Sequence, residues 1–176
     1  ALSAPANEGD LFGGSPGLSI FGAATGKVWF DSGTDLENIA LAYGHYPDDR
    51  GDNKGVEPEG IVFARYGHEE YLFVGMERAN LTAVYDVSGF GKPRFVQGLP
   101  SGMGPEGLLP IPQRDLFVIA SEEDEDVRST ITIYRRQKGE PSYPAIVSDL
   151  RRSGPLARKA PIGWVALSAL TADRLN

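Results

Sequence analysis

The sequence contains no cysteine among its 176 residues. Disulfide bonds, a cysteine nucleophile and a zinc site with cysteine ligands are therefore excluded. Histidine is almost absent as well, because only His45 and His68 are present, and this excludes a metal centre built from several histidines. No apolar run approaches the roughly 20 residues that a membrane-spanning helix requires, so we expect no membrane span.

Acidic residues outnumber basic residues, and this excess of negative charge varies along the chain. The 17 Lys and Arg residues face 24 Asp and Glu residues, which gives a formal charge of −7. This charge argues against nucleic acid as a partner, because phosphate backbones bind basic surfaces. Residues 1–134 carry 21 acids and 9 bases, whereas residues 135–176 carry 3 acids and 8 bases. We interpret residues 138–162 as a linker rich in Pro and Arg, with an anion-binding patch as the alternative.

Glycine and proline are abundant, with 22 and 13 residues, and this favours turns over long helices. Pro58–Ile61 has the sequence Pro-Glu-Gly-Ile, which recurs 47 residues later as Pro-Glu-Gly-Leu at Pro105–Leu108. An apolar run and then an alternating run ending near a tyrosine follow each copy, at residues 71–75 and 81–87 and again at residues 115–119 and 130–134. A repeat of this length with several strands and no helix is typical of β-propeller blades.

We therefore predict an all-β fold made of β-propeller blades in residues 1–137. Residues 19–30 are expected to form the outer strands of an earlier blade, and residues 163–176 the start of a later one. A propeller ring normally needs about four to eight blades. The prediction is thus a partial propeller, a fragment of a longer chain whose missing strands come from the rest of the same protein or from a second chain.

An acidic loop at residues 48–59 precedes the first Pro-Glu-Gly copy. Calcium binds about six to eight oxygen ligands from flexible loops of this kind, although the spacing here differs from that of an EF-hand. The predicted metal ligands are Asp49, Asp52 and Glu57. The alternative is a solvated loop in which nearby basic residues balance part of the charge.

Glu59 and Glu106 occupy equivalent places in the two repeats. In successive blades such residues lie at equal depth, where several carboxylates bind a metal or raise the pKa of one another. The alternative is structural: the glutamate accepts hydrogen bonds from backbone N–H groups in a turn, and the glycine supplies the bend.

These segments together resemble a known family. The sequence Phe-Asp-Ser-Gly-Thr-Asp-Leu-Glu at residues 30–37 is similar to a segment of the bacterial choice-of-anchor I domain family, and further similar segments follow in order at residues 49–60, 73–78, 84–87 and 105–108. Residues 142–147 and 163–173 resemble the start of an esterase-like domain related to phytases. Residues 163–176 would then begin either a further blade or this phytase-like domain.

The resemblance implies an exported bacterial β-propeller, periplasmic or extracellular, related to alkaline phosphatases and phytases. We therefore expect a calcium-dependent phosphoester hydrolase, in which a bound ion neutralises the phosphate and orients water. Glu59 and Glu106 are the candidate catalytic residues, and Arg50 and Arg78 are candidate partners for the phosphate of the substrate.

Two other functions remain open from the sequence. One is a non-catalytic cell-surface or scaffold propeller that binds a protein or a glycan. The other is a protease built on Asp31, which would have to dimerise because such enzymes use two carboxylates that share a proton.

Overall fold

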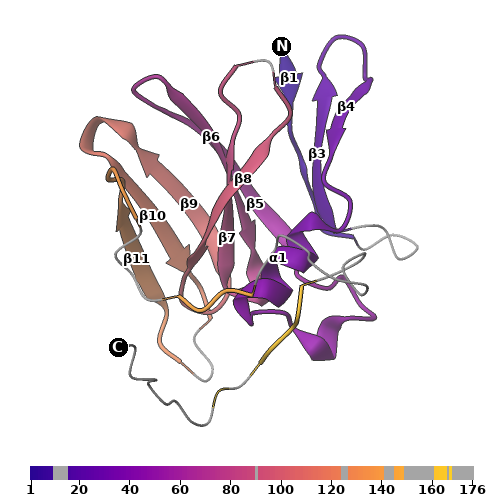
Figure 1. Cartoon of the computed structure of the whole chain (residues 1–176), viewed down its shortest axis with the longest axis vertical. Helices are drawn as coiled ribbons and strands as arrows, with labels where there is room; N and C mark the ends of the chain where they lie inside the picture. The colour runs from indigo at the N-terminus through magenta and orange to yellow at the C-terminus, as the bar shows by residue number, and fades with distance from the viewer. Residues whose placement is uncertain are drawn as a thin grey trace, which may run out of the picture.

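The computed structural model describes residues 1–9, 16–89, 91–123, 127–140, 145–148, 161–165 and 167. Antiparallel strands dominate it, so the predicted all-β fold is confirmed. Three successive sheets stand side by side, with the third sheet at one side of the molecule (Figure 1). Within the second and third sheets the order of strands follows the chain, as expected of blades.

The elements have the following bounds. The first sheet contains β1 (Leu2–Ser3), β2 (Ala6–Asn7), β3 (Gly17–Gly22) and β4 (Val28–Asp31). The second contains β5 (Pro58–Tyr66), β6 (Glu69–Met76), β7 (Leu81–Asp86) and β8 (Arg94–Pro100). The third contains β9 (Pro105–Ile111), β10 (Leu116–Ser121) and β11 (Thr130–Arg135). The helices are α1 (Asp35–Tyr43) and the 3₁₀ turns η2 (Asp48–Arg50), η3 (Glu77–Ala79) and η4 (Pro112–Arg114).

The strands expected in residues 19–30 are present as β3 and β4. β1 and β2 pair with one edge of β3 in a single continuous register, so they are two halves of one interrupted strand. β4 pairs with the opposite edge of β3. The described part of the first sheet is thus three strands wide.

The structure confirms the internal repeat at the level of strand register. In the second sheet Pro58 pairs with Met76 and Gly60 pairs with Gly75, which leaves Glu59 in a β-bulge. In the third sheet Pro105 pairs with Ser121 and Gly107 pairs with Ala120, which leaves Glu106 in the same kind of bulge. Each Pro-Glu-Gly copy therefore begins a strand and bends it with a bulge. The sequence analysis had offered a turn at these positions as the structural role of the two glutamates.

Gly60 allows the second and third sheets to approach closely. A Cβ atom on Gly60 would lie 3.1 Å from the carbonyl oxygen of Glu106 and 3.2 Å from Cδ1 of Leu108. Beyond this contact the rings of Phe73 and Phe117 stack, with centroids 4.0 Å apart and an angle of 16° between the ring planes. The absence of a side chain at residue 60 thus lets β9 pack directly against the second sheet.

The sequence prediction was wrong about β7 and missed α1 and β8. The alternating run at β7 was expected to be half-buried, but residues Leu81–Tyr85 are all buried because neighbouring elements cover both faces of the second sheet. α1 places Leu36, Ile39 and Ala40 in the core on one side of that sheet. It ends at Gly44, whose φ of 70° suits a residue without a Cβ atom.

The C-terminal prediction falls largely on residues outside those described. Residues 163–165 and 167 form neither a helix nor a strand. Nε1 of Trp164 donates a hydrogen bond of 3.0 Å to the carbonyl oxygen of Ala42, so this segment packs at the end of α1.

We predict that Gly60→Ala destabilises the fold by about 1–3 kcal/mol, because its Cβ atom would push β9 away from the second sheet. Gly91→Ala is the matched control, since a Cβ atom at residue 91 would have no neighbour within 4 Å. Urea unfolding measures both changes in the free energy of unfolding. Equal values for the two variants would contradict the close packing described here.

Candidate functional site

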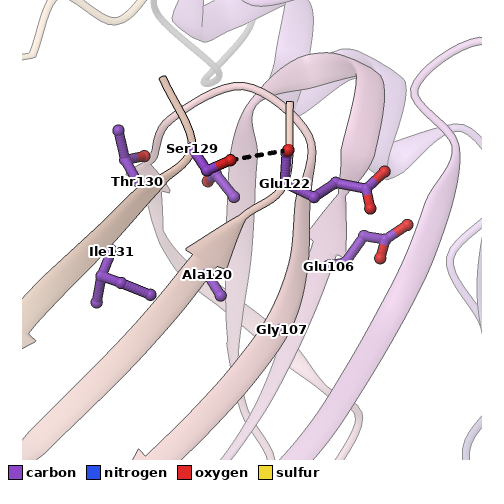
Figure 2. Close-up of a pocket in the computed structure, with 8 residues that line it drawn as sticks. Glu106, Gly107, Ala120, Glu122, Ser129, Thr130 and Ile131 are labelled. Atoms are coloured by element: carbon purple, nitrogen blue, oxygen red, sulfur yellow. Dashed lines mark hydrogen bonds between the residues drawn. The ribbon is translucent and has the colours of Figure 1, made fainter. Parts of the chain in front are cut away.

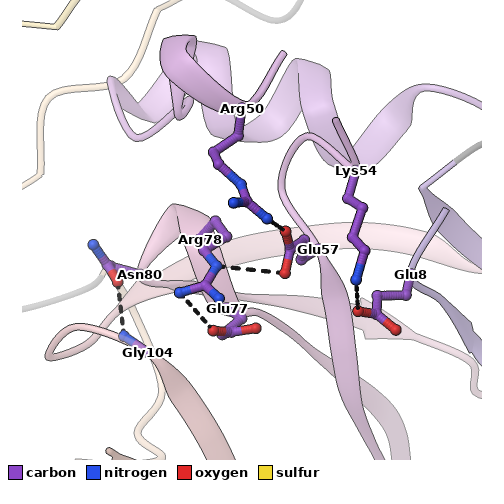
Figure 3. Close-up of polar contacts among 8 residues, drawn as sticks. All are labelled: Glu8, Arg50, Lys54, Glu57, Glu77, Arg78, Asn80 and Gly104. Carbon is purple, nitrogen blue, oxygen red and sulfur yellow. Dashed lines mark hydrogen bonds and ion pairs between the residues drawn. The ribbon is translucent and has the colours of Figure 1, made fainter. Parts of the chain in front are cut away.

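Glu57 lies between two arginines that the sequence analysis had assigned to the substrate. Its Oε1 atom accepts a hydrogen bond from Nη2 of Arg50, and its Oε2 atom lies 3.4 Å from Nε of Arg78 (Figure 3). The side chain of Glu57 is only 3% exposed. The arrangement ties the loop that contains η2 and the turn η3 to the start of the second sheet.

The local backbone explains how this loop brings Glu57 inward. Lys54 and Glu57 both have positive φ angles, of 63° and 47°, and they lie on either side of Gly55 and Val56. The chain therefore turns tightly just before β5, and Val56 is completely buried there. Nζ of Lys54 lies 2.6 Å from Oε1 of Glu8, which adds an ion pair to the first sheet.

The two neighbouring arginines determine the protonation state of Glu57. Burial by itself raises the pKa of this carboxyl, but the hydrogen bond from Arg50 and the positive charges of Arg50 and Arg78 outweigh burial. The pKa of Glu57 therefore lies below its ordinary value. The carboxylate stays ionised at neutral pH and holds both guanidinium groups.

Four other glutamates form what we call the carboxylate cluster: Glu59, Glu77, Glu106 and Glu122. Glu59 and Glu77 form one hydrogen-bonded pair, and Glu106 and Glu122 form the other. Burial, followed by the hydrogen bond with Glu59, raises the pKa of Glu77 to about 7. Burial and the charges of Glu122 and Glu59 likewise raise the pKa of Glu106. The two pairs therefore interact with each other across the junction of the second and third sheets.

Glu77 and Glu122 occupy equivalent positions that the sequence analysis missed. Each follows directly after the last residue of a strand, and they are 45 residues apart. Extending the alignment of the two Pro-Glu-Gly copies through the following strands would have found them. The repeat is not perfect, because the position of Arg78 in the second sheet is taken by Glu123 in the third.

The first sheet shares this pattern. Glu8 follows the last residue of β2, and that residue, Asn7, pairs with the first residue of β3. Met76 and Ser121 likewise pair with the first residues of β7 and β11. All three sheets thus place a glutamate at the same point, where one strand has ended and the next begins.

The structure brings some of the predicted site residues together and leaves others apart. Arg50, Arg78 and Glu57 are joined by ion pairs, and Glu59 and Glu106 lie in the carboxylate cluster. Asp49 and Asp52 are exposed in η2 and in the turn after it. The arginines already contact both oxygens of Glu57, so its geometry does not fit that of a calcium ligand. Within the described ranges, no group of three or more Asp, Glu or His side chains is arranged to hold a metal ion.

A pocket of about 290 Å³ lies beside Glu106 and Glu122 in the third sheet (Figure 2). Its apolar part is formed by Gly107, Ala120 and Ile131. The two carboxylates lie next to each other at one end of it. The pocket therefore combines an acidic end with an apolar sheet surface.

Comparison with known proteins supports the resemblance found in the sequence. Residues 7–90 match the family model described as the choice-of-anchor I domain. The matched range runs from β2 to the end of β7 and contains Arg50, Glu57, Glu59, Glu77 and Arg78. No curated protein and no solved structure matched the chain.

The match indicates an exported protein of the cell surface. None of the helices in the described ranges is long and apolar enough to cross a membrane. The match ends before β8 and the third sheet. The similarity between the second and third sheets is therefore shown by their strand registers and not by the family model. The resemblance of residues 142–173 to a phytase-related domain remains a prediction.

We predict that Glu57→Gln lowers the free energy of unfolding by about 2 kcal/mol, because it leaves two guanidinium groups without their buried carboxylate. Both arginines keep some contact with water, so the loss stays below that of a fully buried pair. Glu8→Gln is the control, and breaking its half-exposed pair with Lys54 should cost less than about 1 kcal/mol. Chemical denaturation measures both variants, and a smaller effect for Glu57→Gln than for Glu8→Gln would contradict the structural role of Glu57.

The raised pKa of Glu77 predicts that stability falls as the pH rises. The folded state holds this proton up to about pH 7, whereas the ordinary pKa of a glutamate is 4.5. The contribution of Glu77 to stability is therefore complete below about pH 4.5 and is lost as the pH approaches 7. Glu57 has the opposite sign, because its lowered pKa makes stability fall on the acid side. Melting temperatures between pH 4 and pH 8 should decline toward pH 8 in the wild type and stay flatter in Glu77→Gln. The exposed Glu140→Gln should follow the wild type.

Proposed function

We propose that this chain is part of an exported surface β-propeller that binds a protein or glycan and does not itself hydrolyse phosphoesters. The observation that carries the proposal is the position of Glu57 between Arg50 and Arg78. These are the two guanidinium groups that a phosphate would have to engage. Their charge is instead used to hold a loop and a 3₁₀ turn against the second sheet.

The charge of the surroundings supports the same proposal. Arg78 also pairs with Glu77, at 2.9 Å between Nη1 and Oε1, so two carboxylates share this one guanidinium. The carboxylate cluster adjoins it and adds further negative charge to this surface. A phosphoester dianion is repelled by such a surface, whereas a neutral glycan or a basic protein segment is not.

Calcium-dependent phosphoester hydrolysis remains the second candidate function. One observation favours it: each of the two glutamate pairs, Glu59 with Glu77 and Glu106 with Glu122, offers two carboxylates, and a hard divalent cation prefers such oxygen ligands. Such an ion would supply the positive charge that the site lacks toward a phosphate. Glu59 and Glu106 are then the residues on which turnover would depend.

Release of phosphate from a chromogenic monoester, with calcium and with a chelator, distinguishes the two functions. We expect no release above the buffer rate in either condition. Turnover that requires calcium and is lost in Glu59→Gln/Glu106→Gln at an unchanged melting temperature would overturn the proposal. Glu140→Gln serves as the exposed control.

Binding and location need their own measurements. Arrays of immobilised glycans and basic peptides, probed with the wild type and with Glu59→Gln/Glu106→Gln, should show a specific signal that the variant weakens. Labelling of intact cells with a membrane-impermeant reagent should reach the protein. A protein protected from the reagent until the cells are lysed would contradict the surface location.

A further inference from the structure

The outer face of the third sheet is apolar and exposed. Leu109, Ile131 and Ile133 are 56%, 63% and 61% exposed, and they project from β9 and β11 on the side away from the second sheet. Val118 lies between Leu109 and Ile133 in the register of the sheet. We call these four residues the outer face.

The equivalent face of the second sheet is buried, and the repeat identifies its residues. The register places Leu109, Val118 and Ile133 where the second sheet has Val62, Phe73 and Val84. Phe73 and Val84 are only 5% and 3% exposed, because the third sheet covers them. The outer face is therefore the counterpart of a surface that is buried by the sheet that follows it in the chain.

The pocket in the third sheet has a counterpart as well. Gly107 and Ala120 take the positions of Gly60 and Gly75 in the second sheet. There, Cδ1 of Leu108 from the third sheet lies close over both glycines, at 3.2 and 3.5 Å from where their Cβ atoms would be. The small residues at 107 and 120 leave the same kind of hollow, and it forms the apolar part of the pocket shown in Figure 2.

We propose that the outer face binds a further antiparallel sheet of the same repeat, supplied by the same polypeptide. This sheet would place a large aliphatic side chain in the pocket over Gly107 and Ala120, as Leu108 does over Gly60 and Gly75. It would also place an aromatic ring over Val118, as Phe117 does over Phe73. The interface continues the one between the second and third sheets, where each sheet covers a face of the sheet before it in the chain.

Cysteine labelling tests this docking surface directly, because the chain has no cysteine of its own. Ile133→Cys places a thiol on the outer face, and Val28→Cys places one on β4 of the first sheet, where the native side chain is equally exposed at 61%. Both variants are labelled with a maleimide in residues 1–176 alone and in the protein isolated at its natural length. We expect similar rates for the two positions in residues 1–176. In the natural-length protein, labelling at position 133 should be at least tenfold slower than at position 28.

Each other result overturns the proposal. Equal rates at the two positions in the natural-length protein would show that no sheet covers the outer face. Protection that appears only at concentrations where the protein is dimeric would assign the face to a second copy. As an independent measurement, Ile133→Lys should lower the melting temperature of the natural-length protein by several degrees and leave residues 1–176 unchanged, whereas Val28→Lys should change neither.

Discussion

The close approach of β9 to the second sheet across Gly60 is the contact on which the other features of the site depend. A side chain at residue 60 would meet the backbone of Glu106, so the contact exists only because the Pro-Glu-Gly segment ends in glycine. The same approach stacks Phe117 on Phe73 and brings the bulged glutamates of two sheets to one level. Packing between sheets therefore creates the electrostatic interactions of the carboxylate cluster.

Around this junction the charged side chains interact mainly with one another. Glu57 pairs with both Arg50 and Arg78, and burial together with the hydrogen bond to Glu59 raises the pKa of Glu77 to about 7. A buried ion pair such as that of Glu57 adds little net stability, because desolvation offsets much of the attraction between its charges. This use of charge explains why arginines that suggest phosphate chemistry in the sequence are paired with carboxylates in the fold.

The sequence predicted the repeated strands well because their signals are local. Apolar and alternating runs mark β6, β7, β10 and β11, and the two Pro-Glu-Gly copies mark the starts of β5 and β9. α1 was missed because its nine residues span only about two and a half helical turns, too few for a clear 3.6-residue apolar pattern. Glu77 and Glu122 were missed because their partners, Glu59 and Glu106, lie 18 and 16 residues away in the sequence. Only the pairing of the two strands in each sheet brings the members of each pair together.

The sequence by itself determined the all-β class, the repeat and the residues that start β5 and β9, because strand patterns and turn residues act over a few positions. Only the tertiary structure decided which charges meet. Arg50 and Arg78 are as compatible with a phosphate as with a glutamate until the positive φ angles at residues 54 and 57 turn Glu57 inward between them. Burial also depends on neighbours. Val84 and Ile133 occupy equivalent positions, yet Val84 is covered by the third sheet, whereas no sheet among the described residues lies over Ile133.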